Sequence, residues 1–338
     1  MCKEKEPLLR VENLVKYYPI KGGLLGRTVS QVHAVDDVSF TINAGETLGL
    51  VGESGCGKST IGRQLAGLEK PTSGKVFYQG QELSKLSGKE MRSIRTQIQM
   101  VFQDNYSALN PRKTIFNILS EPMLYHKLVT RATAEKRVDQ LLDMVGLPKS
   151  AKARYPHEFS GGQRQRIGIA RALSLEPKLI ICDEPVSALD VSVQAQILNL
   201  FRDLQKELDL SYLFIGHGLA AVNYVSDRIA VMYLGQIMEI APAKELFEHP
   251  LHPYTKALCE AIPQPNPHLR SDETQLLTGE IGSAIDPGPG CRFAARCPFA
   301  KESCRMARPA LYTVEGNAQH LVACPVVLDA QNHKEGQE

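Results

Sequence analysis

Alternating apolar and polar residues indicate that the N-terminal part of the chain is rich in β-strands. Within residues 8–50, apolar side chains alternate with polar ones at Val38, Phe40 and Ile42. The run 43–46, Asn-Ala-Gly-Glu, is a turn signal, and the glycine-containing stretch 21–31 favours a loop. The mostly apolar run 47–51 is typical of a buried strand. We therefore predict a β-rich start that leads into one buried strand.

Helical spacing of apolar residues appears after this strand and again in the middle of the chain. Ile61, Leu65 and Leu68 stand at positions i, i+4 and i+7, which predicts a helix. Helical patterns dominate residues 104–172, where the clearest repeat consists of Val138, Leu141, Leu142 and Val145, followed by a helix-ending Gly146. A later amphipathic face comprises Val193, Ile197, Leu200, Leu204 and Leu208. The pattern indicates an α/β core with a helical insertion.

Three further apolar runs predict buried strands, and each delivers polar side chains at its end. Residues 98–102 lead to Gln103, residues 179–182 to Asp183 and Glu184, and residues 212–215 to Gly216, His217 and Gly218. A short strand between Gly74 and Gly80 and a hairpin over 228–240 around Gly235 complete the predicted strands.

The stretch 52–60, Gly-Glu-Ser-Gly-Cys-Gly-Lys-Ser-Thr, fits the phosphate-binding pattern G-x-x-x-x-G-K-[ST]. Glycines let the backbone wrap around phosphate oxygens, and the start of a helix adds amide donors and a positive dipole end. Lys58 is placed to reach the β- and γ-phosphates, and the Ser59 hydroxyl to bind Mg²⁺. The strand–loop–helix context disfavours a plain glycine-rich turn. The nucleotide-binding candidates are Gly52, Glu53, Ser54, Gly55, Cys56, Gly57, Lys58, Ser59 and Thr60.

Two carboxylates and a histidine supply the chemistry that such a site needs. Four apolar residues followed by Asp183 are typical of a strand that holds Mg²⁺, directly or through water, and Glu184 is a candidate general base for the attacking water. Acidic residues at strand ends are often merely solvated, so their weight depends on the accompanying P-loop. A lone histidine is usually structural, but His217 stands where a strand of a P-loop sheet points at the γ-phosphate.

Two more features suit nucleotide binding, although each has a plain structural alternative. Tyr17 and Tyr18 lie just before the 21–31 stretch, where an aromatic side chain could stack on an adenine ring, but tyrosines are also common on edge strands. Ser160 and Gln163 have the spacing of a capping box, and Gly161 and Gly162 expose backbone amides in the first turn. This arrangement suits a second anion site and equally an ordinary helix start.

Together these residues make the chain, over about 8–250, resemble the ATP-binding-cassette (ABC) ATPases. Five motifs occur in the family's order: the P-loop, a Q-loop at Gln103, the signature at 159–163, the Walker B strand at 179–184, and the switch histidine His217. The resemblance implies a RecA-like core with an antiparallel β subdomain and a helical subdomain. We therefore predict an α/β fold, a P-loop NTPase of the ABC type, with a small C-terminal cysteine-containing extension.

In that family two cassettes clamp two ATP molecules head to tail, which implies roles for residues that face a partner. By this resemblance the signature residues serve ATP bound on the partner cassette, and Asp190 links the two sites. Gln103 senses Mg²⁺ and the nucleophilic water, and Tyr18 takes the position of the adenine-stacking aromatic. Since Ser and Asp usually flank the switch histidine, Gly216 and Gly218 are departures that predict a slower or looser site.

Four of the eight cysteines gather in the C-terminal tail. Cys291, Cys297, Cys304 and Cys324 give the spacing C-x5-C-x6-C-x19-C. In a cytosolic chain such a set suggests metal ligands rather than disulfides. The spacing lacks the short knuckles of most zinc sites, whereas thiolates also suit a [4Fe–4S] cluster. Scattered buried cysteines are the alternative, and this is how we interpret Cys2, Cys56, Cys182 and Cys259.

The tail, from the His-Pro-Tyr-Thr run at 252–255 through the cysteines, resembles the C-terminal extension of the ATPase subunits of dipeptide, oligopeptide and nickel importers. Residues 106–112 and 160–166 also resemble that subfamily, in particular its second-type subunit, which pairs with a related ATPase. The resemblance implies an iron–sulfur cluster at the four tail cysteines. We divide the chain into an ABC nucleotide-binding domain at 1–250, with its helical subdomain at about 104–172, and an extension at 251–338.

This resemblance implies an ATP-hydrolysing subunit of an importer for di- and oligopeptides. Its cofactors would be ATP, Mg²⁺ and the [4Fe–4S] cluster. Its partners would be two transmembrane permease subunits, a related second ATPase subunit (with a homodimer as the alternative) and an extracytoplasmic solute-binding protein. The segment 106–116 would receive the coupling helices of the membrane subunits.

Composition narrows the class of protein without changing this hypothesis. The 338 residues are 43% hydrophobic and 22% charged, as in ordinary soluble proteins, and a net charge of +2 gives no reason to expect nucleic acid. No run of about 18 apolar residues appears, and residues 1–6 lack the apolar core of a signal peptide. We expect a peripheral protein at the cytoplasmic face of the cell membrane.

Three alternatives stay open. The same ATPase role fits an importer of nickel or another small solute, because an ATPase does not contact the cargo. A cassette ATPase acting on DNA or ribosomes would usually carry coiled coils, two fused cassettes or strong basic patches. A module that binds ATP without hydrolysing it is disfavoured by the presence of both Glu184 and His217.

Overall fold

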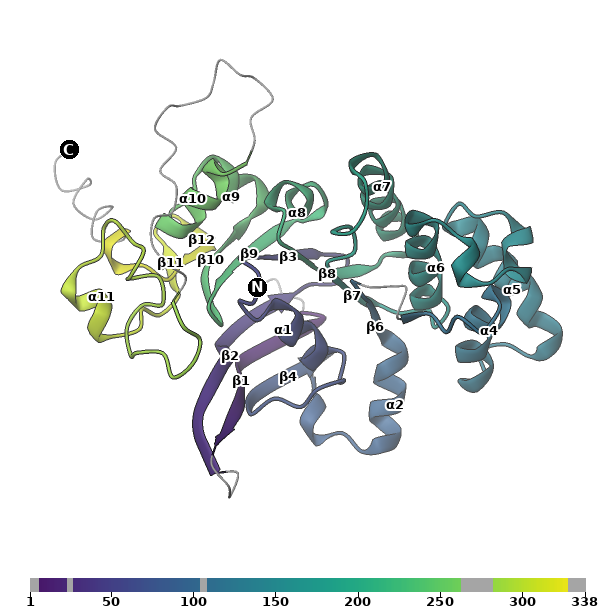
Figure 1. Ribbon diagram of the computed structural model, residues 1–338, viewed down its shortest axis with the longest axis horizontal. Coiled ribbons are helices and arrows are strands. Elements are labelled where there is room, and N and C mark those ends of the chain that lie inside the picture. The colour runs from purple at the N-terminus through teal and green to yellow at the C-terminus, as the bar shows by residue number, and fades with distance from the viewer. Residues whose placement is uncertain (1–5, 23–26, 104–107, 263–281, 328–338) are drawn as a thin grey trace, which may run out of the picture.

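The computed structural model describes residues 6–22, 27–103, 108–262 and 282–327, whose strands form two sheets (Figure 1). The smaller, antiparallel sheet has the order β2-β1-β4-β5 and the larger the order β11-β12-β10-β9-β3-β8-β7-β6. The first comprises β1 (Leu9–Gly22), β2 (Arg27–Ile42), β4 (Ser73–Tyr78) and β5 (Gln81–Glu82). The second comprises β3 (Thr47–Val51), β6 (Ile98–Val101), β7 (Leu179–Asp183), β8 (Ser211–Gly216), β9 (Arg228–Tyr233), β10 (Gln236–Pro242), β11 (Tyr312–Val314) and β12 (Asn317–Val322).

Helices alternate with the strands of the larger sheet, as the sequence predicts. The described helices are α1 (Lys58–Leu65), α2 (Gly88–Gln97), α4 (Ile115–Tyr125), α5 (Arg131–Met144), α6 (Gly161–Leu173), α7 (Val191–Leu208), α8 (Leu219–Val225), α9 (Ala243–Glu248), α10 (Pro253–Glu260) and α11 (Glu302–Met306). Short 3₁₀ turns occupy Leu83–Lys85, Lys149–Ala153 and Pro156–Glu158. None of the described helices is long and apolar enough to cross a membrane.

The centre of the larger sheet is parallel and fully buried. β3 pairs with β8 and β9, β8 with β7, and β7 with β6, all in parallel. Successive side chains of β7 point to opposite faces, so Ile180 joins the core beneath the helical segment and Ile181 joins the core shared with the four-stranded sheet. A strand that is buried on both faces consists of consecutive apolar residues, and for this reason the sequence predicts β7 clearly.

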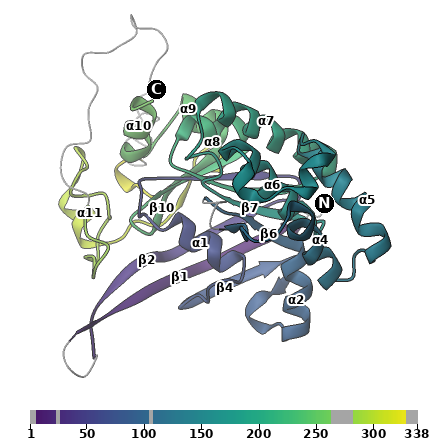
Figure 2. The ribbon, with the colours of Figure 1, turned by 45° about the vertical axis from the view of Figure 1, so that its right-hand side comes forward.

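The helical segment lies at one end of the molecule. Helices α4, α5 and α6 gather beside β6 and β7, at the opposite end from α11 of the C-terminal extension (Figures 1 and 2). The predicted helix through Val138 and Leu142 is confirmed as α5, and Gly146 adopts the left-handed φ of +69° that follows its end. The α/β fold with a helical insertion is therefore confirmed.

Two local predictions were wrong. Most of the predicted loop 21–31 is a two-stranded ribbon, because β1 continues to Gly22 and β2 starts at Arg27, with Gly22 paired to Arg27. The structure of this stretch depends on the pairing between the two strands, which its glycine content does not indicate. Helix α1 ends at Leu65, followed by Gly67 at a φ of +65°, so Leu68 is not on a buried helical face and is 60% exposed.

The C-terminal extension is joined to both sheets. β12 pairs with β10, and β11 pairs with β12, so the last strands extend the larger sheet. Ile285 forms a bridge to Val32 of β2, and the Asp286 N–H donates to the carbonyl of Gln31 at 2.9 Å. The extension therefore lies against the strands that flank the P-loop.

Helix α10 begins at a buried histidine whose protonation opposes folding. His252 is the N-cap residue, and its Nδ1 accepts a hydrogen bond from the Tyr254 N–H at 3.1 Å. Burial lowers the pKa of His252 from 6.5 to about 4, although the nearby Glu239 works against this shift. Between these pH values the unfolded chain binds a proton that the folded chain does not, so stability is lost as the pH falls through this window.

We expect the parent protein to lose about 2 kcal/mol more unfolding free energy than a His252→Asn variant when the pH falls from 7 to 5. Asparagine keeps a capping acceptor but does not titrate. Denaturant unfolding of both proteins at the two pH values measures the difference. The same loss in parent and variant would contradict the prediction.

Candidate functional site

The P-loop connects the end of β3 to the start of α1. Gly52 has a φ of +153° and Gly57 a φ of +105°. A Cβ atom at Gly52 would lie 2.0 Å from the carbonyl oxygen of Met232, and one at Gly57 would lie 1.9 Å from that of Ala34. Only glycine can pass this close to a neighbouring strand in these conformations. The strand–loop–helix unit predicted from residues 47–60 is therefore confirmed.

Lys58 is held inside this loop. Its side chain is buried, and Nζ donates hydrogen bonds to the carbonyl oxygens of Gly52 at 2.8 Å and Glu53 at 3.0 Å. The ammonium group thus stands within the turn of backbone, next to the amides that follow Gly52. This is the position from which a P-loop lysine binds phosphate oxygens.

Ser59 and Asp183 meet between α1 and β7. The Ser59 hydroxyl donates to Asp183 Oδ1 at 2.7 Å. Burial raises the pKa of Asp183, while the hydrogen bond from Ser59 lowers it. A buried carboxylate beside a hydroxyl is a donor set that Mg²⁺ prefers, and a cation would compensate the desolvated charge. The residues present therefore fit Mg²⁺.

Three polar side chains converge just past the ends of adjacent strands β6, β7 and β8. Glu184 Oε2 accepts a hydrogen bond from Gln103 Nε2 at 2.7 Å and lies 3.4 Å from His217 Nδ1. The Glu184 backbone adopts a φ of +45°, held by its N–H donating to the carbonyl of Ile215 at 3.0 Å. The His217 side chain is 58% exposed. The structure brings together the three residues that the sequence proposes for hydrolysis.

Tyr18 lies beside α1, whereas its neighbour Tyr17 faces the extension. The Tyr18 hydroxyl donates to Glu69 Oε1 at 2.7 Å, and burial together with this contact raises the Tyr18 pKa. Tyr17 instead stacks on His33, with ring centroids 3.8 Å apart, and donates to Asp36 at 2.6 Å. Because Tyr17 is already stacked, Tyr18 is the better candidate for adenine.

The signature residues form an exposed helix start. Ser160 Oγ accepts from the Gln163 N–H at 3.3 Å, and Gln163 Oε1 accepts from the Ser160 N–H at 3.0 Å, which is the predicted capping box. Ser160, Gly161 and Gln163 are exposed and Gly162 is half-buried. Asp190, the exposed N-cap residue of α7, makes no side-chain capping bond. Their roles toward a partner cassette stay predictions.

The two glycines beside His217 differ in the space around them. A Cβ atom at Gly216 would lie 2.7 Å from Val222 Cγ2, whereas one at Gly218 would meet nothing within 4 Å. Gly218 is the N-cap residue of α8 and provides no side-chain cap. An aspartate would therefore fit at Gly218, while a serine at Gly216 requires Val222 to move. The slower or looser site stays a prediction.

The predicted iron–sulfur cluster is wrong. Cys291, Cys297, Cys304 and Cys324 line one cavity of about 250 Å³, but no group of three or more metal-ligating side chains is found in the described part of the chain. Burial raises the pKa of Cys291 to about 11 and also raises the pKa of Cys297 and Cys324, which favours neutral thiols. Cys291 and Cys297 pack against the main core and Cys324 against Val322, as small apolar residues do.

Other predictions fall outside the described residues. These are the ones on Cys2 and on Tyr106 and Ser107 of the 106–116 segment. Cys56 and Cys182 are buried and Cys259 is half-buried, consistent with packing.

Sequence reasoning missed two residues that contact the P-loop. The Glu53 N–H donates to the Tyr254 hydroxyl at 3.0 Å, and Arg296 Nη1 lies 3.0 Å from each Glu53 carboxylate oxygen. Both partners come from the region after residue 250. In the sequence they are a tyrosine and an arginine within a tail that resembles a family extension. That resemblance does not indicate that Arg296 contacts Glu53, which lies 243 positions away in the chain.

A buried P-loop lysine, a serine–aspartate pair and a glutamate at strand ends define a P-loop nucleotide hydrolase. Its fold matches solved ABC cassettes. CbiO1 from Clostridium perfringens is 29% identical with a TM-score of 0.63, covering 72% of this chain and 92% of that one. The ATP-binding cassette MJ0796, described as a dimer bound to ADP and phosphate, is 26% identical with a TM-score of 0.61, covering 70% and 98%.

Full-length relatives define the family. Residues 35–187 match the family model "ABC transporter", and residues 238–304 match "Oligopeptide/dipeptide transporter, C-terminal region". The chain is 51% identical to the oligopeptide transport ATP-binding protein AppF of Bacillus subtilis, covering 95% of this chain and 97% of the relative. It is 50% identical to OppF of Salmonella typhimurium, covering 96% and 97%. The chain belongs to the ABC transporter ATPases that carry the oligopeptide/dipeptide transporter C-terminal region, and it is an ATPase.

Proposed function

We propose that this ATPase energises the import of di- and oligopeptides. The observation that carries the proposal is one chain with both a full set of ATP-site motifs and a C-terminal region of the oligopeptide/dipeptide transporter type at residues 238–304. The relatives named above, which are oligopeptide transport proteins along nearly their whole length, support peptides over nickel as cargo. We also propose the division into a nucleotide-binding domain at 1–250 and an extension at 251–338.

In the proposed mechanism the P-loop amides and Lys58 bind the phosphates, and Tyr18 stacks on the adenine. Ser59 and Asp183 would hold Mg²⁺, which when bound neutralises charge on the phosphates. Glu184 accepts a proton from the attacking water, for which Gln103 orients its carboxylate through the 2.7 Å hydrogen bond. His217, whose Nδ1 lies 3.4 Å from Glu184 Oε2, would contact the γ-phosphate.

Neither cassette is sufficient alone in this proposal. The exposed signature residues, from Ser160 to Gln163, would present amides of the first turn of α6 to ATP bound on a partner cassette. Asp190 at the start of α7 would link the two sites. ATP then bridges the two cassettes, and its hydrolysis releases them.

The proposed partners are two transmembrane permease subunits, a related second ATPase and an extracytoplasmic solute-binding protein, with this chain at the cytoplasmic face. Support for a docking surface comes from the helical end of the molecule. A groove on α4 is lined by Lys113, Asn117, Glu121 and Tyr125, and the Tyr125 ring is 68% exposed. Lys113 belongs to the segment 106–116, which we propose receives the coupling helices, and the other lining residues follow that segment.

The test is a pull-down of Glu184→Gln from its native host with ATP present, followed by identification of the co-purifying proteins. We expect two polytopic membrane proteins and a second cassette ATPase. The isolated complex, reconstituted with the solute-binding protein, should then import labelled peptides in an ATP-dependent way. Co-purification of ribosomes or nucleic acid, with no membrane protein, would refute the transport role, and import of nickel but not peptides would refute the cargo.

A further inference from the structure

One residue of the P-loop, Glu53, is bound through both its backbone and its side chain by residues from the C-terminal part of the chain. The Glu53 carboxylate accepts from Arg296 Nη1 at 3.0 Å to each oxygen, and its backbone N–H donates to the Tyr254 hydroxyl at 3.0 Å. The third polar group of the residue, its carbonyl, accepts from Lys58 Nζ at 3.0 Å. Glu53 therefore connects the phosphate-binding lysine to the extension.

The pair is sheltered, so its charges matter. The Arg296 side chain is 7% exposed and that of Glu53 is 23% exposed. A carboxylate in the P-loop lowers the affinity for any anionic ligand, because like charges repel more strongly where water is largely excluded. A guanidinium bound to both carboxylate oxygens removes that cost and fixes the side chain in one direction.

Arg296 is itself placed by a packed aromatic cluster. Phe293, three residues earlier, lies 5.4 Å from the rings of both Tyr233 and Tyr254, and its carbonyl accepts from the Arg296 N–H at 3.0 Å. Tyr233 belongs to β9 of the larger sheet. The same cluster thus holds Arg296 and the Tyr254 hydroxyl on two sides of Glu53.

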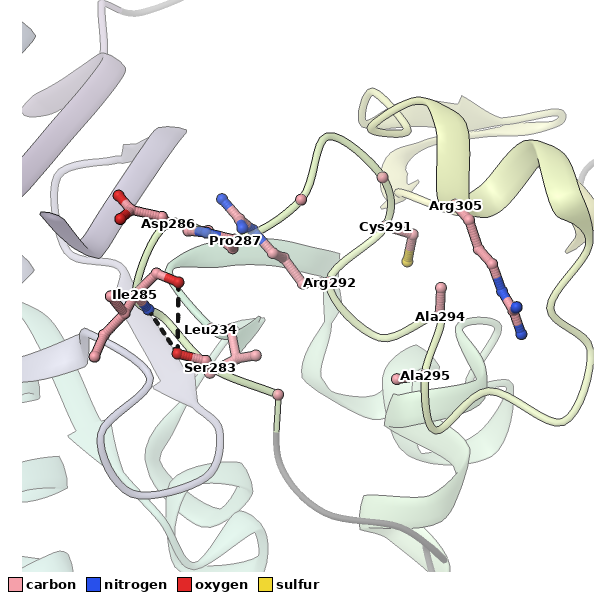
Figure 3. Close-up of a pocket in the computed structure, with 13 residues that line it drawn as sticks. Leu234, Ser283, Ile285, Asp286, Pro287, Cys291, Arg292, Ala294, Ala295 and Arg305 are labelled. Carbon is pink, nitrogen blue, oxygen red and sulfur yellow. Dashed lines mark hydrogen bonds between the residues drawn. The ribbon is translucent and has the colours of Figure 1, made fainter. Parts of the chain in front are cut away.

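Two other arginines of the extension, Arg292 and Arg305, have surroundings that differ from those of Arg296. Arg292 donates to Asp36 of β2, with a side chain that is 6% exposed. Arg305 is exposed and lines a cavity of about 700 Å³ beside the 283–292 loop, where its guanidinium points away from Arg292 (Figure 3). Arg305 thus offers a matched control for the removal of positive charge from this extension.

We propose that Arg296 is a positioning residue for nucleotide binding, which acts through Glu53 by neutralising its carboxylate and fixing the first turn of the P-loop. The extension thereby sets the ATP affinity of the cassette to which it is attached. The inference goes beyond the import function and does not depend on which solute is transported.

The test uses the full-length chain in its complex with the partner cassette and the permease subunits, purified from the native host, with ATP as the only added ligand. Arg296→Met is expected to raise KM for ATP about tenfold, with kcat at saturating ATP changed by less than about threefold, because the negative charge of Glu53 is then no longer neutralised in the loop that binds the phosphates. Arg296→Lys keeps the charge and should recover most of the affinity. Arg305→Met should leave KM unchanged within about twofold.

A double-mutant comparison separates electrostatics from a folding defect. In a Glu53→Gln background no carboxylate remains to be neutralised, so adding Arg296→Met should change KM by less than about twofold. Thermal unfolding of each variant checks that the extension stays folded. The proposal is overturned if Arg296→Met leaves KM at the parental value, or if it raises KM by the same factor with and without the Glu53 carboxylate.

Discussion

Glu184→Gln is expected to lower the rate of ATP hydrolysis by about 10²–10³-fold while ATP binding is kept. Glutamine preserves the shape of the side chain and can still hydrogen-bond to Gln103, but it cannot take a proton from the attacking water. Because bound ATP is then not consumed, the closed pair of cassettes should accumulate. Phosphate release at saturating ATP measures the rate, and size-exclusion chromatography with ATP measures the dimer.

The control for this prediction is Glu176→Gln. Glu176 is an exposed glutamate whose side chain pairs with Arg137, away from the P-loop. This substitution should leave the rate within about twofold of the parent, since exposed ion pairs contribute little. A Glu184→Gln protein that still hydrolyses ATP at the parental rate would falsify the assignment of the general base.

Gly57→Ala is expected to abolish measurable ATP binding, with the affinity reduced more than about 100-fold. The added Cβ would lie 1.9 Å from the Ala34 carbonyl oxygen, and the φ of +105° is already unfavourable for alanine. Either the loop or β2 must move, and the amides that bind phosphate move with the loop. Titration of a fluorescent ATP analogue measures the affinity.

The matched variant is Gly55→Ala in the same loop. Gly55 also has a positive φ, of +80°, but a Cβ atom there would meet nothing within 4 Å. Only conformational strain of about 1–2 kcal/mol is added, so we expect a loss of affinity of about thirtyfold or less. If the two variants lose affinity equally, the close approach to β2 is not what makes Gly57 necessary.

Much of the nucleotide site could be predicted because its functional residues lie within short, continuous segments of the sequence. The P-loop, Asp183 and Glu184 each follow a continuous apolar run, and parallel strands buried on both faces make such runs easy to recognise. Glycines at fixed spacing carry the same kind of local signal. The convergence of Gln103, Glu184 and His217 follows once their strands are placed side by side.

Features that depend on distant partners could not be predicted in this way. The ribbon of β1 and β2 continues through a stretch whose glycines suggested a loop, because each strand stabilises the other. The pairing of Arg296 with Glu53 joins positions 243 residues apart. The spacing of the tail cysteines shows only that they are near one another in the sequence. It does not indicate the burial that raises the pKa of Cys291 and Cys324 and favours neutral thiols.

The addition of β11 and β12 to the larger sheet also protects the folded protein from strand pairing with other molecules. Without them β10 would be an outermost strand, and Glu239, which accepts from His320 Nε2 at 2.7 Å, would lose that partner. An uncovered strand edge is a template for pairing with another molecule. A chain interrupted after about 250 residues would therefore be prone to aggregate, whereas in the described residues the larger sheet ends in the short β11, only three residues long.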